Sequence, residues 1–156
     1  MRSGSFAADL QSMRRFVAAA LAALCLAGAA GATIKPGRGM SRVELGMTAA
    51  QVQARLGRPV AKGGWKWYYA RVTVTFRNRR VVELMTTRST ERLANGLGVD
   101  SSEAEVRAAF PRAQCGSMPP FYRRCRLGTG APKSRVTDFI FGTTRHVIYV
   151  IVTQLP

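Results

Sequence analysis

The sequence is poor in the residue types that catalysis and metal binding require. Histidine occurs once, at His146, and only eight of the 156 residues are Asp or Glu. Nucleophilic catalysis needs Ser, Cys or Thr beside a base and an orienting group, and a metal site needs at least about three clustered ligands. Neither pattern is present, and no pair of carboxylates has the spacing that general acid-base chemistry demands. We therefore predict a non-enzymatic protein with no metal and no cofactor.

The N-terminus has the order of a secretory signal peptide. Arg14 and Arg15 precede an apolar run over residues 16–27, and small residues ending in Ala-Gly-Ala at 30–32 offer a cleavage site. We predict that residues 1–32 are a signal peptide. Because Met13 opens this pattern, translation is expected to begin there.

Two other interpretations of the N-terminus are weaker. A membrane anchor needs roughly 20 strongly apolar residues, and this run is shorter and rich in Ala and Gly. A lipoprotein needs a Cys at the cleavage site, whereas Cys25 lies inside the apolar run. We expect a secreted, periplasmic or cell-envelope protein without a transmembrane segment after cleavage, and retention of the segment as an anchor stays open.

Positive charge dominates what remains after cleavage. Residues 33–156 contain 21 Lys and Arg against 7 Asp and Glu, a net charge of +14, and most of the cations are Arg. Such a surplus attracts acidic surfaces. The expected partner is an unidentified protein or an anionic envelope polymer. Nucleic acid would also fit basic residues interleaved with aromatics, but export removes the protein from it, so we predict no nucleic-acid partner.

Two cysteines remain in the predicted mature chain, Cys115 and Cys125. In an oxidising compartment such a pair is expected to form a disulfide. By closing a short loop, this disulfide would contribute on the order of 2 to 3 kcal/mol to stability. There is no C-x-x-C motif, so a redox or metal role is not expected.

Two segments align without a gap, TAAQVQARLGRP at 48–59 and SEAEVRAAFPRA at 102–113. Each opens with a capping box, a hydroxyl residue followed three positions later by Gln51 or Glu105. Each then places apolar side chains four positions apart, so that one helix face can pack. Proline at or near each end stops the helix.

Each predicted helix is followed by an aromatic and basic segment and then by a β-hairpin pattern. The hairpin strands are expected at residues 72–76, 81–86, 136–141 and 147–153. A change in the parity of the apolar positions predicts a bulge or break near Ala70 and Arg71.

Each half therefore reads helix, strand, strand, strand, the first over residues 40–94 and the second, with the disulfide, over residues 95–156. One half alone is too small to bury a core, so the two halves are expected to share a sheet or pack together. We predict an α+β fold in which two helix-strand-strand-strand repeats place their helices on one face of an antiparallel sheet. The other face would be free.

The order of these motifs resembles a known family. It comprises a Gly-Met-Thr helix start at 46–48, a Leu-Gly-x-Pro helix end at 56–59, a Trp-Tyr-Tyr strand at 67–69 and a Phe-turn-Val hairpin at 76–81. It is similar to the SmpA/OmlA repeat of BamE-like outer-membrane assembly lipoproteins, which occurs in tandem in the β-lactamase inhibitory protein. The resemblance covers residues 40–153 and implies an open sheet that contacts another protein or a lipid head group.

The aromatic and basic residues after each helix are the remaining feature. Trp, Tyr and Arg dominate interface energetics because they bury much area and make directional contacts. Alternatively, alternate aromatics fill the core while Arg solvates the other side, an interpretation favoured for Trp67 and Tyr69. The candidate partner-binding residues are Trp65, Trp67, Tyr68, Arg71, Tyr122 and Arg124.

Together these features predict an exported binding module that contacts an acidic envelope component or a protein partner through an aromatic and basic sheet face. The alternative is a proteinaceous inhibitor of a secreted hydrolase, such as a β-lactamase or a protease. Both functions would use the same face and would differ in the partner.

Overall fold

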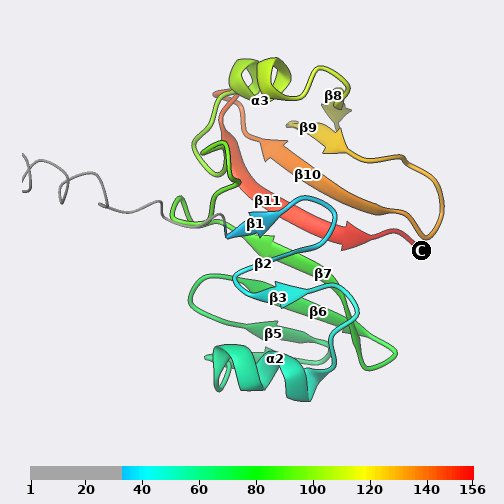
Figure 1. The fold of residues 1–156 in the computed structure, drawn as a ribbon. Helices are drawn as coiled ribbons and strands as arrows, with labels where there is room; N and C mark the ends of the chain where they lie inside the picture. The colour runs from blue at the N-terminus through cyan, green and yellow to red at the C-terminus, as the bar shows by residue number, and fades with distance from the viewer. Residues whose placement is uncertain (1–32) are drawn as a thin grey trace, which may run out of the picture. The chain divides into compact units, whose positions relative to one another are not determined.

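The computed structural model describes residues 33–156 and builds them around an eight-stranded antiparallel sheet (Figure 1). The predicted signal peptide and the alternative start at Met13 lie outside the described residues. No helix in the described part is long and apolar enough to cross a membrane.

The large sheet combines strands from both halves of the chain. In spatial order its strands are β4 (Ala61–Gly63), β5 (Lys66–Tyr68), β6 (Thr73–Arg77), β7 (Arg80–Thr86), β11 (Val147–Gln154), β10 (Arg135–Phe141), β9 (Tyr122–Leu127) and β8 (Gln114–Met118). The hairpins predicted from alternation are confirmed as β6–β7 and β10–β11. The predicted break near Ala70 and Arg71 is the loop between β5 and β6, and a separate bulge lies between Thr75 and Phe76.

A second, three-stranded sheet covers part of the large one (Figure 1). Its strands are β1 (Ile34–Lys35), β2 (Gly39–Met40) and β3 (Val43–Glu44). The backbones of β2 and β3 approach so closely that a Cβ at Gly39 would collide with the carbonyl oxygen of Val43. Ile34, Met40 and Val43 are at most 1% exposed and belong to the same core cluster as the large sheet. The small sheet therefore packs over the hydrophobic core and helps to shield it from solvent.

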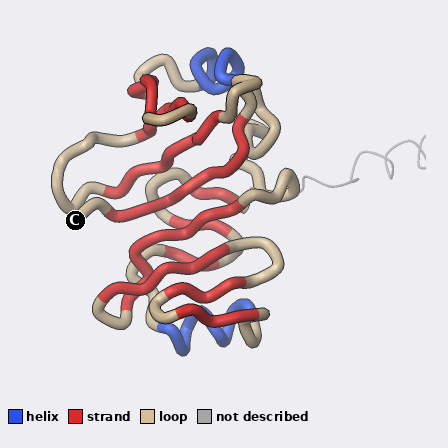
Figure 2. Tube along the Cα trace, turned by 180° about the vertical axis from the view of Figure 1, so that it is seen from behind, coloured by secondary structure: helices blue, strands red, loops and turns tan. Residues whose placement is uncertain are grey.

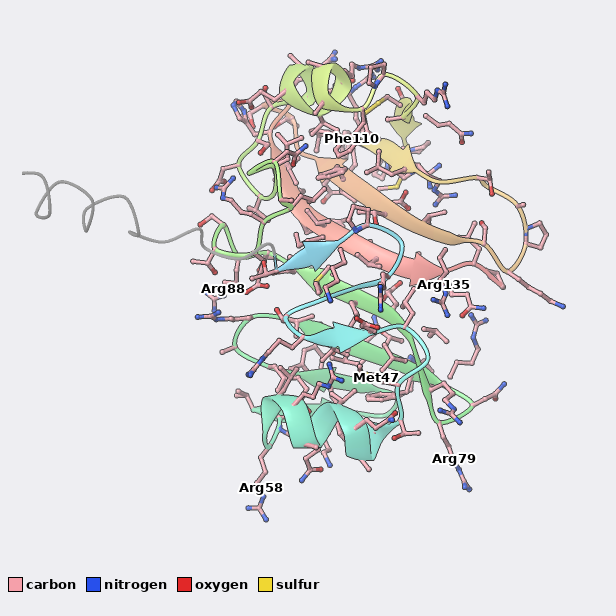
Figure 3. All side chains as sticks on the ribbon, in the orientation of Figure 1. Met47, Arg58, Arg79, Arg88, Phe110 and Arg135 are labelled. Carbon is pink, nitrogen blue, oxygen red and sulfur yellow. A yellow bond between two sulfur atoms is a disulfide. The ribbon has the colours of Figure 1, made fainter. Side chains whose placement is uncertain are left out.

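The two described helices, α2 (Ala49–Leu56) and α3 (Glu103–Ala109), start as predicted. Both capping boxes are formed: the hydroxyls of Thr48 and Ser102 each accept a hydrogen bond from the backbone N–H three residues later. Each helix buries one valine completely and lies at an opposite end of the large sheet (Figure 1). Phe110, after α3, stacks 6.2 Å from Phe139 of β10, between helix and sheet (Figure 3).

The predicted fold class is wrong. Strand makes up 44% of the described residues and helix 12%, and an eight-stranded and a three-stranded sheet replace the two helix-strand-strand-strand repeats with helices on one sheet face. The error has physical causes. Residues 34–44 form strands of two residues each, too short to show any period. The edge strand β4 is fully exposed and so lacks alternation, and the other edge strand, β8, is mostly exposed and has no regular alternation either.

The predicted disulfide is confirmed between Cys115 of β8 and Cys125 of β9, which are directly opposite each other. Cys125 is fully buried in the core. The bond therefore adds a covalent link to the backbone pairing that joins the edge strand β8 to β9.

A buried carboxylate fixes α3 to the sheet. Glu103, in the first turn of α3, is 6% exposed and accepts hydrogen bonds from three arginines. The nearest nitrogens are 2.8 Å away for Arg123 of β9, 2.9 Å for Arg107 and 3.2 Å for Arg145 of the β10–β11 turn. The hydrogen bond from Arg123 is the main cause that lowers the pKa of Glu103 from 4.5 to about 2. The Glu103 carboxylate thus joins α3, β9 and the β10–β11 turn.

This network predicts a pH-dependent stability. Because the folded pKa of Glu103 lies below its unfolded value, its contribution is complete above about pH 4.5 and is lost as the pH falls towards about 2. Glu103→Gln, which mimics the protonated acid, should lower the free energy of unfolding by about 2 to 3 kcal/mol near pH 7. Urea denaturation over this range should show the two proteins converging at low pH, and a constant difference would contradict the role given to Glu103.

Candidate binding face

The register of the large sheet divides its side chains between two faces. Side chains alternate along each strand, so residues directly opposite each other share a face. Phe139 pairs with Val150, and both are fully buried in the core. We call their side the covered face, because the small sheet and the helices pack on it. Figure 2 shows the other side, with no helix or strand in front of the eight strands.

This second side, here called the open face, carries an apolar centre of its own. Its central and flanking side chains are Tyr68, Met85, Tyr122, Arg124, Ile140, Tyr149 and Ile151. Met85 pairs with Ile151, and Ile140 pairs with Tyr149. Ile140 is only 2% exposed, although it does not belong to the core cluster. The accessible apolar area of this face therefore comes from the half-buried Met85, Tyr149 and Ile151 around it.

Tyrosines surround this apolar centre. Tyr68 and Tyr122 are 42% and 40% exposed and come from opposite halves of the chain. Tyr149 lies on the inner strand β11. Burial, with a smaller effect of Tyr122, raises the pKa of Tyr149 above the usual value. Each of the three rings presents apolar area together with a hydroxyl that can hydrogen-bond.

The charges of the open face are only partly paired. Arg126 donates two hydrogen bonds to Asp138 directly opposite, Nε to Oδ1 at 2.8 Å and Nη2 to Oδ2 at 2.7 Å, and the pair raises the pKa of Arg126. Glu83 accepts a hydrogen bond from Thr75. Arg124 and Lys66 have no ion-pair partner among residues 33–156. They leave uncompensated positive charge beside the apolar centre.

Three of the six predicted partner-binding residues share this face: Tyr68 on β5, and Tyr122 and Arg124 on β9, on the other side of the apolar centre. The other three lie elsewhere. Trp67 points to the covered face, opposite Val74, where its ring meets Phe76 edge-on at 4.9 Å. Lys62 Nζ is 4.1 Å from the centroid of the same ring. Trp67 is therefore a packing residue, in agreement with the core interpretation of alternate aromatics.

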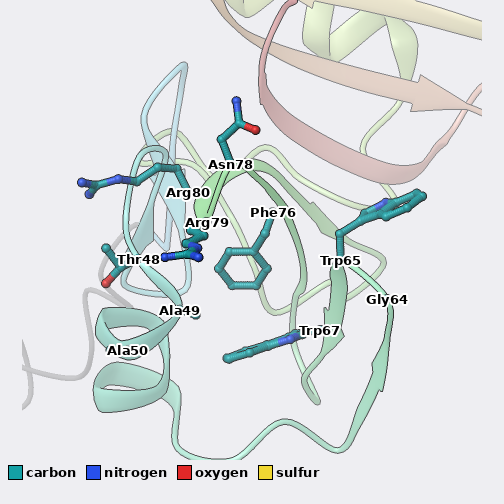
Figure 4. A pocket seen from close by; sticks show the side chains of 10 residues that line it. All are labelled: Thr48, Ala49, Ala50, Gly64, Trp65, Trp67, Phe76, Asn78, Arg79 and Arg80. Atoms are coloured by element: carbon teal, nitrogen blue, oxygen red, sulfur yellow. The ribbon is translucent and has the colours of Figure 1, made fainter.

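Trp65 belongs to a different feature, an aromatic pocket of about 720 Å³ beside α2. It lies in the β4–β5 turn, is 69% exposed, and shares the pocket wall with Trp67, Phe76 and Arg79 (Figure 4). Arg80 points away from these rings and donates to the carbonyl oxygen of Gly46 at 3.1 Å. The pocket offers aromatic surface with a guanidinium nearby, at the end of the sheet.

Arg71 is on neither face. It lies in the loop between β5 and β6, with Nη1 3.7 Å from Oε1 of the fully buried Glu91. Its carbonyl oxygen accepts a hydrogen bond from Thr86 at 2.7 Å. The prediction that Arg71 acts with the sheet residues therefore has no support in its position.

The sequence interpretation missed the centre of the open face: Met85, Ile140, Tyr149 and Ile151. A signal was present, since Val150 and Val152 alternate with Tyr149 and Ile151, and both sets are apolar. A strand that is apolar on both sides, in a sheet whose helices cover one side, indicates a second apolar face.

Within residues 33–156, no three His, Cys, Asp or Glu side chains are placed to hold a metal ion. His146 is exposed, and its Nδ1 is 3.0 Å from the carbonyl oxygen of Thr144 in the β10–β11 turn. This agrees with the interpretation of His146 as a solvated residue.

The two tryptophans are predicted to differ in their effect on stability. Trp67→Ala removes half-buried packing against Phe76 and should lower the free energy of unfolding by about 1 to 3 kcal/mol. Trp65→Ala removes an exposed ring and should cost less than about 0.5 kcal/mol. Urea denaturation of both variants measures the difference. Equal losses would show that Trp65 is also a packing residue.

No family model matches the sequence, and no curated protein matches it significantly. Two solved structures share the fold. An extracellular protein containing a SCP domain from Bacillus anthracis str. Ames aligns with a TM-score of 0.52 at 12% identity, over 70% of this chain and 44% of that one. A DUF4309 family protein, YjgB, from Bacillus subtilis subsp. subtilis str. 168 aligns with a TM-score of 0.50 at 13% identity, over 69% of this chain and 78% of that one.

This chain therefore spans less than half the length of the first of these proteins. At such low identity the likeness extends to the fold alone. Neither protein is described as an SmpA/OmlA protein, so that resemblance stays a prediction.

Proposed function

We propose that this chain is an exported, non-enzymatic module that binds an acidic protein through the open face. The observation that carries the proposal is the second apolar centre, the half-buried Met85, Tyr149 and Ile151 around the buried Ile140, which no helix or strand of the described chain covers. Contiguous apolar surface outside a core is characteristic of interaction sites.

The composition of the face fits a protein partner better than a flexible polymer. Interface centres are depleted in charge and rich in Tyr and Arg, with a polar rim. Here the aliphatic centre is flanked by Tyr68 and Tyr122, and Arg124 supplies a cation beside it. An anionic envelope polymer would need a charged track more than an apolar centre, so we place it second.

Charge and compartment support an acidic, extracytoplasmic partner. The net charge of +14 over residues 33–156 favours encounter with negatively charged surfaces. The disulfide between Cys115 and Cys125 fits an oxidising compartment, and so does the predicted signal peptide. One protein of similar fold is also extracellular. Inhibition of a secreted hydrolase would be one form of this binding, and no described residue favours it over other protein partners.

A matched pair of charge reversals tests the proposal. Arg124→Glu on the open face and Arg79→Glu in the β6–β7 turn change the net charge equally. The open-face variant should bind envelope extract and culture medium of the producing cell at least about tenfold more weakly, and the turn variant less than about threefold, as measured by immobilised-protein binding with quantitative mass spectrometry.

Binding of the unchanged protein should also weaken steeply from low to high salt, because exposed charges steer the encounter. Equal loss in both variants would mean that net charge alone drives retention, and this would contradict an open-face contact. Binding that is insensitive to salt would contradict the acidic nature of the partner.

A further inference from the structure

A cavity of about 530 Å³, separate from the open face, lies where three segments meet: the β2–β3 turn, the end of α2 and the loop between β5 and β6. Its volume is in the range of small-molecule sites. One part of its wall is apolar, with Leu56, Val60 and Val72. Another is basic, with Arg42 and Arg71, and Arg58 extends outward beside it (Figure 3). No carboxylate lines it within the described chain.

A buried hydroxyl of the cavity wall lacks a partner. The Tyr69 hydroxyl oxygen is inaccessible to solvent and makes no hydrogen bond to any residue of 33–156. Burial raises the pKa of Tyr69, which keeps the phenol protonated and able to donate near pH 7. Buried polar atoms of folded proteins nearly always have a partner. Because this hydroxyl is closed off from solvent, the accessible donors of the cavity wall are its arginines.

The loop that carries Tyr69 and Arg71 is held firmly. The Tyr69 N–H donates to the carbonyl oxygen of Val72 at 3.0 Å. The carbonyl oxygen of Ala70 accepts from Arg88 Nε at 3.0 Å, and that of Arg71 accepts from Thr86 Oγ1 at 2.7 Å. The backbone of this wall is consequently fixed before any ligand arrives, which lowers the entropic cost of ordering the loop on binding.

The opposite wall is built at a conformational cost. Ser41 and Arg42 form the β2–β3 turn with φ of +50° and +69°, values that cost a non-glycine residue on the order of 1 kcal/mol. Ser41 Oγ donates to Oε2 of the buried Glu91 at 2.6 Å, and Glu91 Oε1 faces Arg71 at 3.7 Å. Arg42 and Arg55 each donate to the other's carbonyl oxygen, at 3.1 and 2.9 Å. These contacts hold the guanidinium groups of Arg42 and Arg71 at the cavity.

We propose that this cavity binds a small amphiphilic anion. A phosphate or carboxylate group accepts hydrogen bonds from Arg71, with Arg42 beside it, and an apolar chain lies along Leu56, Val60 and Val72. Arginine is suited to such oxyanions because its planar fork donates two parallel hydrogen bonds. A cationic amphiphile would be repelled, and a neutral one would leave the donors unsatisfied.

Isothermal titration calorimetry of the purified protein tests the site with three probes. Octyl phosphate carries both chemical groups, inorganic phosphate only the charge, and octyl glucoside only the chain. Octyl phosphate should bind at least about tenfold more tightly than either of the others, since only it uses both walls. Absence of octyl phosphate binding, or equal binding of octyl glucoside, would overturn the proposal.

Variants locate the binding. Tyr69→Phe should leave octyl phosphate binding within about twofold and the free energy of unfolding unchanged or higher, because the hydroxyl is closed to solvent and has no protein partner to lose. Arg71→Gln should weaken it about tenfold, whereas the control Arg79→Gln, which removes the same charge in the β6–β7 turn, should stay within about twofold. If the control weakens binding as much as Arg71→Gln, the interaction is non-specific and the proposal fails.

If octyl phosphate binds, a vesicle experiment distinguishes two sources of such a ligand, a membrane lipid and a free amphiphile. If the unchanged protein binds phosphatidylglycerol vesicles and Arg71→Gln does not, with phosphatidylcholine vesicles as the blank, the ligand is a membrane lipid. Unchanged vesicle binding would identify a free amphiphile. Octyl phosphate binding should be unaffected by Arg124→Glu, so the cavity and the open face can fail independently.

Discussion

The antiparallel pairing of β7 with β11 is the contact on which the rest of the structure depends. Four residue pairs, from Val150 with Thr86 to Thr153 with Glu83, join the two halves of the chain into one sheet. The same pairing fixes both faces: Leu84 and Val152 meet in the core, while Met85 and Ile151 meet on the open face. A shift of one residue would exchange these sets. The apolar centre of the proposed interface therefore exists only because this register is kept.

The few carboxylates serve mainly to position structure. Glu103 joins α3 to the sheet, Asp138 pairs with Arg126 across β10 and β9, and Glu91 holds the β2–β3 turn. Glu44 contacts Lys35 and Arg38 within the small sheet and its turn. With the acids committed in this way, most of the arginines have no acidic partner in the described chain. This surplus, beside an apolar face, is why the proposed partner of the open face is acidic.

Local features of the fold could be predicted from the sequence, but its architecture could not. The capping boxes, the two hairpins and the disulfide depend on residues close in the chain or on chemistry that leaves few alternatives. The fold class was wrong because strands of two or three residues carry no periodicity, and these strands form the small sheet and an edge of the large one. The predicted α+β repeat gave too much weight to two short helices.

The candidate site was predicted in part for a similar reason. Tyr68, Tyr122 and Arg124 share the open face, whereas Trp65 and Arg71 line separate cavities and Trp67 packs on the covered face. Which of two adjacent aromatics faces outward depends on register, which local sequence does not determine. The cavity at Tyr69 was not visible from the sequence, since its wall comes from three separate segments.

Site-specific photo-crosslinking shows directly whether a partner docks on the open face. A benzophenone amino acid would replace Tyr68 or Tyr122 on the open face, or the exposed Arg112 after α3 as the off-face position, before incubation with envelope extract of the producing cell. Binding through the open face predicts the same crosslinked protein from positions 68 and 122 and none from position 112. Crosslinks from position 112 with none from the two tyrosine positions would contradict binding through the open face.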